Sequence, residues 1–391
     1  MRLGFHYHIP AIMKESKIFM PGYLGRFLDS LASECESITC FMHSPVGLEI
    51  DEMDYALKAQ NIHLVDIGPH VSVPKRMLSS FKVKKIVRKF SEKIDLMLIR
   101  GPSPLLPDIA NVFKRDSASL LIVGDYLAGI VDSTQPSWRK VLVRIWSKWN
   151  SNRQLKIANS SLVFVNSHLL FQHYQFQTKN LVETRTTTLS LTDFYKREDT
   201  CQTSPLHLLY TGRIDRAKGL LDILDALKTV VGSGEDIVFD LVGMLVKGDN
   251  ILEEIFNKAK LYGLSERIKF HGYKPLGPEL FEFYKQADIY ILASQSSEGF
   301  PRTIWEAMAH SLPVIATKVG SIPDFVGGAA LLVDPNRPDK LAAAVKEIIS
   351  NKELRVENIN KGYELAQTNT LEIRAKQMIT EMENYLRRLK K

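Results

Sequence analysis

Short apolar segments alternate with amphipathic segments along the whole chain. The apolar segments read as buried strands at residues 3–8, 37–42, 62–67, 96–99, 119–123, 162–166, 207–211, 238–242, 268–271, 289–293, 314–316 and 330–333. Between them, stretches such as residues 220–231, 251–262 and 339–350 place apolar side chains at helical spacing. This alternation predicts an α/β protein, in which parallel sheets are covered by helices on both faces.

A polar, threonine-rich stretch interrupts the pattern near residues 183–205 and is typical of a linker. A chain of 391 residues also exceeds what one hydrophobic core usually supports. We therefore expect two Rossmann-like, doubly wound domains, residues 1–190 and 191–370, each with about six strands. Ligands of such folds bind at the carboxyl ends of strands, so we expect the domains to face each other across a cleft. Residues 371–391 have a helical pattern, and we expect this helix to cross back to the first domain.

The formal charge of +7 is unevenly distributed. One basic cluster covers residues 75–93, where eight lysines and arginines accompany one acid, and a second covers residues 138–156. Such faces bind nucleic acid, anionic lipid or phosphorylated ligands, and they are equally common as solvated helix surfaces. We expect no nucleic-acid partner, because the sequence lacks the aromatic platforms and recognition motifs of that class.

The second basic cluster also carries apolar residues at helical spacing: Trp138, Val141, Leu142, Ile145, Trp146 and Trp149. A basic helix with tryptophans can lie in a membrane interface. The alternative, that the helix packs its apolar side on the first domain, is the preferred interpretation for most of these residues.

The cysteines Cys35, Cys40 and Cys201 have no metal-ligand spacing and indicate reduced thiols. Arg2 and His6 interrupt any signal-peptide core, and no apolar run approaches the ~20 residues that span a bilayer. We therefore expect a cytoplasmic protein. Any membrane contact would be peripheral, at the inner face of the cell membrane.

Two glutamates, Glu298 and Glu306, stand eight positions apart. Gly299 permits a close backbone approach, and Pro301 suits the first turn of a helix. Glu298 is therefore expected in a loop at the mouth of a helix that carries Glu306. Free amides at a helix N-terminus bind anions. Carboxylates beside such amides predict a sugar nucleotide, with the carboxylates for its hydroxyls and the amides for its phosphates.

A second turn carries positive charge. After the strand at residues 207–211 come Gly212, Arg213 and Lys218, followed by Gly219 and a helix. Arginine grips phosphate with two N–H groups, and lysine supplies a compact charge, so the segment suits a diphosphate. A charged surface turn is the alternative.

Other nucleotide and metal signatures are absent from the sequence. No Gly-x-Gly-x-x-Gly opens a helix, no P-loop is present, and no Asp-x-Asp pair or His/Cys cluster suggests a metal. If residues 212–219 hold a diphosphate, protein cations neutralise it. We expect neither a metal nor another cofactor.

These motifs follow one another in an order that resembles the family-4 retaining glycosyltransferases of the GT-B fold, the glycosyl transferases group 1. Residues 210–219 resemble the diphosphate-binding turn of that family, and residues 239–243 resemble its next strand and glycine. Residues 268–273 resemble the strand whose end lines the nucleobase pocket. Glu298 and Glu306 fit the signature pair of the family, and its pattern continues to Gly320.

The resemblance implies a role for each candidate residue. Arg213 and Lys218 would neutralise the leaving diphosphate, and Glu306 would bond the ribose hydroxyls. Glu298 would hold the transferred sugar near its anomeric carbon. Attack would come from the face that the leaving group departs from, with a diphosphate oxygen helping to deprotonate the acceptor. The rest of the donor site would come from Gly212, Gly243, Tyr273, Gly299, Phe300, Pro301, Arg302 and Thr303.

The chain also departs from the pattern of the family. Ser311 stands where a glycine is usual, and a glycine expected near Leu245 is missing. Asp125 stands near the position of a histidine that often faces the sugar. It could bond a sugar hydroxyl and is a catalytic candidate, with a strand-end cap as the alternative.

Two residues are candidates on the acceptor side. Gly22 belongs to a turn that loosely resembles the glycine loop near the acceptor. Arg100 follows the strand at residues 96–99 and could meet an acidic acceptor, although an ordinary surface arginine is the preferred interpretation.

The sequence thus predicts a retaining, metal-independent hexosyltransferase. By analogy with the family, the donor is UDP-glucose or UDP-N-acetylglucosamine. The acceptor would be a glycan or a lipid-linked glycan in bacterial exopolysaccharide or lipopolysaccharide-type synthesis, with peripheral contact to an anionic membrane. The alternative is a non-catalytic sugar-nucleotide or polysaccharide-binding protein on the same fold. The presence of Glu298, Glu306, Arg213 and Lys218 favours the enzyme.

Overall fold

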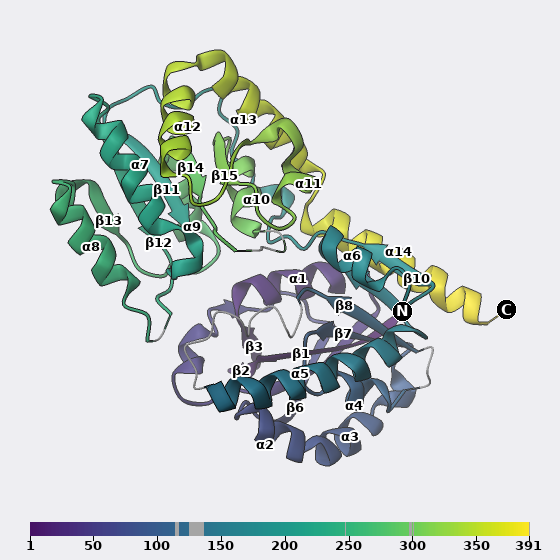
Figure 1. The fold of residues 1–391 in the computed structure, drawn as a ribbon. Coiled ribbons are helices and arrows are strands. Elements are labelled where there is room, and N and C mark those ends of the chain that lie inside the picture. The colour runs from purple at the N-terminus through teal and green to yellow at the C-terminus, as the bar shows by residue number, and fades with distance from the viewer. Residues whose placement is uncertain (114–116, 125–136, 247, 297–298, 300, 391) are drawn as a thin grey trace. The chain divides into compact units, whose positions relative to one another are not determined.

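The computed structural model describes residues 1–113, 117–124, 137–246, 248–296, 299 and 301–390, without the side chains of residues 137–140. The chain divides into two compact units (Figure 1). The first contains residues 1–186 and 372–391, and the second contains residues 187–371. The division after Thr186 falls within the threonine-rich stretch of the sequence.

The first unit combines a parallel sheet, a small antiparallel sheet and surrounding helices. Its strands are β1 (Arg2–Pro10), β2 (Ile12–Lys14), β3 (Lys17–Met20), β4 (Ser37–Ser44), β5 (Tyr55–Ala56), β6 (Ile62–Pro69), β7 (Leu96–Gly101), β8 (Ala118–Ile122), β9 (Leu162–Val165) and β10 (Asn180–Glu183). Its helices are α1 (Gly22–Ala32), α2 (Val73–Leu78), α3 (Ser80–Arg88), α4 (Leu106–Ala110), α5 (Ser137–Ala158), α6 (His168–Tyr174) and α14 (Leu371–Leu389). The hydroxyl of Tyr385 on α14 donates to the Ser160 carbonyl at 2.9 Å, which ties this terminal helix to the first unit.

The large sheet of the first unit has the strand order β10-β9-β8-β7-β1-β4-β6, and all its pairs are parallel. The chain builds outward from β1 in one direction and then, starting with β7, in the other. The point between β1 and β7 is therefore the topological switch point, where ligands of doubly wound sheets bind. Strand β10 is a seventh strand that the sequence pattern did not predict, because it is a half-buried edge strand and not an apolar run.

The second unit repeats this architecture. Its strands are β11 (Leu206–Thr211), β12 (Ile237–Val242), β13 (Ile268–Phe270), β14 (Ile289–Leu292), β15 (Val314–Thr317) and β16 (Leu331–Val333). Its helices are α7 (Leu220–Gly232), α8 (Ile251–Leu261), α9 (Pro278–Gln286), α10 (Arg302–Ala309), α11 (Ile322–Val326), α12 (Pro338–Ser350) and α13 (Lys352–Gln367). The sheet order β13-β12-β11-β14-β15-β16 is again parallel throughout, so the switch point lies between β11 and β14.

Every apolar segment that was predicted as a strand overlaps a strand of one of these two sheets. Helices lie on both faces of each sheet (Figure 1). The inner strands β12, β14 and β15 of the second unit are buried at every position, and the core there includes Trp305, Tyr284 and Tyr290. Strands that are covered on both faces read as continuous hydrophobic runs, which explains why the sequence identified them.

Helix α5 contradicts the prediction that most of its apolar residues pack on the first unit. Its polar residues Ser147, Asn150 and Gln154 are buried, and the Gln154 amide donates to the Tyr174 hydroxyl at 2.7 Å. Because polar partners occupy the inner face, the apolar side chains on the other face remain exposed. These are Val141, Leu142, Ile145 and Trp149.

Candidate functional site

The turn after β11 is held against the segment after β14, at the switch point of the second unit. The amide of Gln295 donates to the Ala217 carbonyl at 2.8 Å. Gly219 has a φ of 65°, and a Cβ atom there would lie 2.0 Å from the Ala293 carbonyl oxygen. Only glycine fits this position, since both the left-handed backbone and the close approach exclude a side chain.

A second close approach joins the ends of β11 and β12. The Gly212 amide donates to the Val242 carbonyl at 3.0 Å. A Cβ atom at Gly243 would lie 1.6 Å from the Gly212 carbonyl oxygen. The Gly243 amide in turn donates to the Gly272 carbonyl at 2.9 Å, and half-exposed Tyr273 follows. The structure therefore brings Gly212, Gly243 and Tyr273 to one edge of the sheet.

Two of the basic residues in the turn have defined ion pairs. The exposed Arg213 guanidinium lies 3.6 Å from the Asp215 carboxylate. Its backbone carbonyl accepts a hydrogen bond from the Tyr210 hydroxyl at 2.6 Å. Arg216, by contrast, is bound to Glu254 on α8. Arg213 and Lys218 therefore remain the candidates for binding phosphate. Lys218 is the last residue of the short 3₁₀ segment Arg216–Lys218.

The mouth of α10 lies in the segment that follows β14. Helix α10 begins at Arg302, and its N-cap residue Pro301 supplies no side-chain cap. The first amides of such a helix are suited to an anionic ligand. Gly299 is exposed at this mouth, whereas Glu298 and Phe300 lie outside the described residues.

Glu306 is buried in the second unit, with an exposed fraction of 4%. One carboxylate oxygen accepts a hydrogen bond from the Thr188 hydroxyl at 2.6 Å, and the other accepts one from the Tyr284 hydroxyl at 2.8 Å. Burial and the charge of Glu306 raise the pKa of Tyr284 well above its ordinary value, so this phenol stays a donor. Each carboxylate oxygen keeps capacity for a further hydrogen bond.

A chain of hydroxyl groups connects this carboxylate to the end of β11 and to the mouth of α10. The Tyr284 hydroxyl pairs with the Thr211 hydroxyl at 2.6 Å. The nearby Tyr290 hydroxyl donates to the Thr303 hydroxyl at 2.6 Å and also lies 3.4 Å from the Thr211 carbonyl oxygen. These contacts fix the turn at residues 212–219 and the α10 mouth in one geometry.

Sequence reasoning named Thr303 but missed Thr211, Tyr284 and Tyr290, the other members of this hydroxyl chain. One signal was available, because Tyr290 interrupts a strand that is otherwise entirely aliphatic. A buried phenol requires a hydrogen-bond partner, and it therefore indicates a polar contact inside the core.

The two departures from the family pattern have structural explanations. Ser311 adopts a φ of 55°, which is the conformation that a glycine would favour. Its hydroxyl donates to the Tyr195 carbonyl and accepts from the Arg197 amide, both at 3.1 Å, so the serine gains a bridge. Leu245, in place of the expected glycine, pairs with Ile214 in an isolated β-bridge and extends the contact between the two loops.

The acceptor-side candidates lie in the first unit. The Gly22 amide, at the start of α1, donates to the Asp54 carboxylate at 2.7 Å, so a carboxylate already occupies this helix end. The expectation that Arg100 is a surface residue is wrong. Its exposed fraction is 9%, and its guanidinium lies 4.8 Å from the centre of the Tyr7 ring, because β7 is an inner strand. Asp125 lies outside the described residues.

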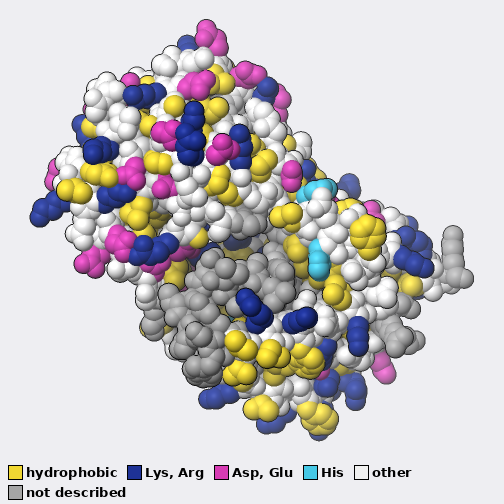
Figure 2. All heavy atoms as spheres, viewed as in Figure 1, with side chains coloured by type: hydrophobic (Ala, Val, Ile, Leu, Met, Phe, Trp, Pro, Cys, Tyr) yellow, Lys and Arg dark blue, Asp and Glu magenta, His cyan; other side chains and the backbone are white. Residues whose placement is uncertain are grey.

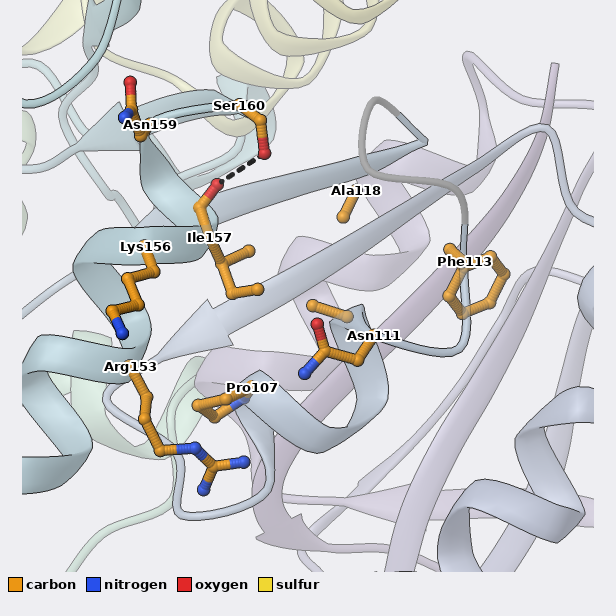
Figure 3. A pocket seen from close by; sticks show the side chains of 10 residues that line it. Pro107, Asn111, Phe113, Ala118, Arg153, Lys156, Ile157, Asn159 and Ser160 are labelled. Carbon is orange, nitrogen blue, oxygen red and sulfur yellow. Dashed lines mark hydrogen bonds between the residues drawn. The ribbon is translucent and has the colours of Figure 1, made fainter.

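A cavity of about 740 Å³ lies elsewhere in the first unit (Figure 3). Arg153 and Lys156 of α5 line it, together with Asn111 after α4 and Ala118, the first residue of β8. It is therefore at the amino end of β8, opposite the carboxyl edge where the candidate residues lie. We do not assign it to the candidate site.

Neither a metal centre nor a membrane span was found among the described residues. No three His, Cys, Asp or Glu side chains in that part of the chain are grouped as metal ligands. No helix there combines the length and the hydropathy needed to cross a bilayer.

Comparison with known proteins finds a family match within the second unit. Residues 192–365 match the family model of the Glycosyl transferases group 1. An uncharacterised glycosyltransferase of Methanocaldococcus jannaschii is 33% identical over 149 residues, which are 38% of this chain and 39% of that protein. The lipopolysaccharide 1,2-N-acetylglucosaminetransferase of Salmonella typhimurium is 31% identical over 154 residues, 37% of this chain and 40% of that protein. The chain spans about two fifths of the length of the curated relatives that it matches.

The likeness in fold extends over nearly the whole chain. The crystal structure of Anabaena HepE in complex with UDP and glucose aligns with a TM-score of 0.71 and 16% sequence identity, covering 98% of this chain and 100% of HepE. The predicted fold class, two Rossmann-like α/β domains of the GT-B kind, is confirmed. That the two domains face each other across a cleft stays a prediction.

Proposed function

We propose that the protein is a glycosyltransferase whose nucleotide-sugar donor binds at the β11–β14 edge of the second unit. The observation that carries the proposal is the fixed arrangement of the turn at residues 212–219 and the α10 mouth. The Gln295–Ala217 hydrogen bond and the Gly219–Ala293 contact hold the turn, and the hydroxyl chain ends at Thr303 on α10. The matched family segment, residues 192–365, contains all these groups.

The chemistry of this edge suits departure of a nucleoside diphosphate. Negative charge grows on the diphosphate as the glycosidic bond breaks, and preorganised cations and dipoles at that point lower the barrier. Arg213, Lys218 and the amides that open α10 would supply them, without a metal ion. Glu298 would stabilise the oxocarbenium-like centre, as carboxylates do in glycoside hydrolysis. A diphosphate oxygen would accept the acceptor proton, and the configuration would be retained.

The sugar donor we favour is a UDP-hexose, either UDP-glucose or UDP-N-acetylglucosamine. The structural similarity to HepE, whose crystal contains UDP and glucose, supports this choice. The similarity to a lipopolysaccharide N-acetylglucosaminetransferase supports a glycan or lipid-linked acceptor in surface polysaccharide synthesis. Glu306 would contact the ribose through the acceptor capacity that Thr188 and Tyr284 leave.

Donor binding and donor turnover can be tested separately. We expect UDP and one UDP-sugar to raise the melting temperature by mass action, with GDP- and ADP-sugars inactive. Glu298→Ala should keep UDP binding and lose sugar transfer or donor hydrolysis. Arg213→Ala should weaken UDP binding roughly tenfold, the value of a charge-assisted contact. Arg337→Ala removes an exposed arginine of the same unit and is the matched control.

The outcomes separate the proposal from its alternative. Donor binding without turnover under any acceptor condition would favour a non-catalytic sugar-nucleotide-binding protein. If no nucleotide stabilises the protein, or if Arg337→Ala weakens binding as much as Arg213→Ala, the assignment of the site is wrong.

We also propose that α5 and the neighbouring helices α2 and α3 form a membrane-contact surface, the α5 surface. Leu142 and Ile145 are more than half exposed on α5, and Leu78 and Phe81 are more exposed still. The indole of Trp146 donates to the Met77 sulfur at 2.9 Å and joins α5 to α2. Figure 2 shows hydrophobic and basic side chains gathered over this part of the first unit.

The energetics of the α5 surface favour an anionic bilayer. Burying one large apolar side chain contributes ~1.5–3 kcal/mol. Each basic side chain near an anionic surface adds ~1 kcal/mol. The exposed basic residues of these helices include Lys75, Lys82, Lys85, Arg144 and Lys148.

Sedimentation with phosphatidylglycerol-containing vesicles tests the α5 surface. We expect binding at low salt, loss of binding at high salt, and little binding to pure phosphatidylcholine. A Leu142→Glu, Ile145→Glu double variant should abolish binding. Leu261→Glu, at an 80% exposed leucine in the second unit, should bind as the unmodified protein does. Absence of low-salt binding would refute this part of the proposal.

A further inference from the structure

The carboxyl edge of the sheet in the first unit carries arginines and histidines that the donor site does not use. Two of them lie at the ends of β1 and β7, the strands on either side of the switch point. The others come from the ends of β4 and β6 and from α2. We call this set the first-unit cluster; its members are His8, His43, His70, Arg76 and Arg100.

Two strands become irregular where they present these side chains. The pairing of β1 with β4 shifts register between His6 and Pro10, and that of β4 with β6 shifts between Met42 and Ser44. The shifts flank His8 and His43, respectively. Such irregularities re-aim side chains and are frequent beside ligand sites.

The contacts within the first-unit cluster are close. The rings of His43 and His70 have their centres 5.7 Å apart. The Arg76 guanidinium donates to the His8 carbonyl at 3.4 Å. Arg100 lies over Tyr7, whose ring centre is 4.3 Å from that of His8. Side chains from four strands and one helix therefore meet at one end of the sheet.

Several buried polar atoms of these side chains have no hydrogen-bond partner among the described residues: Nδ1 of His8, Nε2 of His43, Nε2 of His70 and Nε of Arg100. The other ring nitrogen of His43 donates to the Gly68 carbonyl at 3.0 Å, and that of His70 pairs with the Glu49 carboxylate at 2.6 Å. Buried polar atoms are nearly always bonded in folded proteins, so several without partners in one place indicate a ligand.

The charge of the first-unit cluster indicates what the ligand carries. Burial and the nearby Arg76 lower the pKa values of His8 and His43 to about 4, so both rings are neutral at pH 7. The Arg100 guanidinium is buried, and no carboxylate of the described residues forms an ion pair with it. A buried cation without a counter-ion is costly, and an anionic ligand offsets that cost.

We infer that the first-unit cluster binds a sugar that carries a phosphate or a carboxylate group. The guanidiniums of Arg76 and Arg100 donate to the anionic oxygens. A neutral imidazole such as that of His43, which already donates through Nδ1, accepts a hydroxyl hydrogen at Nε2. This inference rests on the glycosyltransferase function proposed above. The ligand is then the acceptor, and the first-unit cluster determines which acceptors are used.

Thermal-shift and calorimetric titrations of the full chain, with the donor site saturated by UDP, test the inference. The probes are glucose 6-phosphate, glucuronic acid and glucose. We expect one or both anionic sugars to stabilise the protein and glucose to have no effect. A response to glucose 6-phosphate alone identifies a phosphate site, and a response to glucuronic acid alone identifies a carboxylate site.

Variants then assign the binding to the first-unit cluster. Arg100→Met should weaken the anionic sugar at least about tenfold, while the UDP shift stays unchanged. Arg88→Met removes an exposed arginine of the same unit and should bind as the unmodified protein does. Arg100→Lys keeps the charge and should bind with intermediate affinity. If Arg100→Met fails to fold, Arg100→Lys and the comparison with glucose still show whether binding depends on Arg100 and on the anionic group of the sugar.

The results separate this inference from the proposed function. If UDP stabilises the protein but neither anionic sugar does, or if glucose does so equally, the inference is wrong and the donor site stands. If Arg100→Met leaves the anionic sugar bound, the site lies elsewhere. If UDP does not bind, the proposed function fails, and the response to the anionic sugars alone still tests the cluster.

Discussion

Gly219→Ala is the sharpest perturbation that the structure offers in the second unit. Gly219 connects the turn at residues 212–219 to α7, and Ala217, two positions before it, accepts a hydrogen bond from the Gln295 backbone amide. The added Cβ atom would lie 2.0 Å from the Ala293 carbonyl oxygen. That distance is more than ~1 Å shorter than a van der Waals contact. Both contacting groups belong to buried backbone, so no flexible side chain can move aside.

The expected loss of stability has three parts. Alanine at a left-handed φ costs ~1–2 kcal/mol. Relieving the collision adds ~1–3 kcal/mol of overpacking strain. Separation of the two loops also removes the Gln295–Ala217 bond, worth ~1 kcal/mol. Gly263→Ala is the matched control, because Gly263 has a φ of 69° but open space at its Cβ position, so only the backbone part applies.

Urea unfolding of the two variants measures the difference. We expect Gly219→Ala to lose ~3–6 kcal/mol of unfolding free energy and Gly263→Ala to lose ~1–2 kcal/mol. Gly219→Ala should also lose the thermal stabilisation by UDP, which Gly263→Ala should keep. Equal losses in both variants, with the UDP shift intact in both, would refute the argument that this close approach shapes the donor site.

Three further predictions use the same unfolding assay. Ser311→Ala should destabilise the protein by ~1–2 kcal/mol, because it keeps the left-handed φ and loses two hydrogen bonds, while Ser311→Gly should lose less. Tyr284→Phe should cost ~1–3 kcal/mol, since it removes one donor from the buried Glu306 carboxylate; a neutral result would mean that this contact is absent. Because the pKa values of His8 and His43 are lowered from 6.5 to about 4, their contribution to stability is complete above pH 6.5 and should fall between pH 6.5 and 4. His43→Gln should flatten this dependence, and an unchanged slope would contradict the burial of a neutral ring.

The fold was predictable because its inner strands are covered on both faces. Strands such as β9 and β14 are buried at every position and read as short apolar runs. Strand β10 escaped because it is half-buried along its length and carries polar residues. Helix α5 shows the limit of periodicity, which identifies two faces of a helix but not the face that turns inward. Gln154 and its partner Tyr174 decide that orientation, and they are 20 positions apart.

The candidate donor site was predictable only as far as its parts are local. Glycines before and after two cations indicate a tight turn, and the structure uses Gly212 and Gly219 for close approaches. The hydroxyl chain behind the site was not predictable, because Tyr284 and Thr211 are 73 positions apart. Contacts of that kind depend on the packing of α9 against β11, which no local pattern encodes.

The two units share one strand order but use its switch point differently. In the second unit the edge is lined by glycine backbone, at Gly212 and Gly243, which suits the close approach of an extended diphosphate. In the first unit the corresponding edge is lined by side chains, among them His43 and Arg100. Backbone amides recognise a group that many ligands share, whereas converging side chains read the shape and charge of one ligand. Substitutions in the first-unit cluster should therefore change which acceptor is used and leave the donor preference as it is.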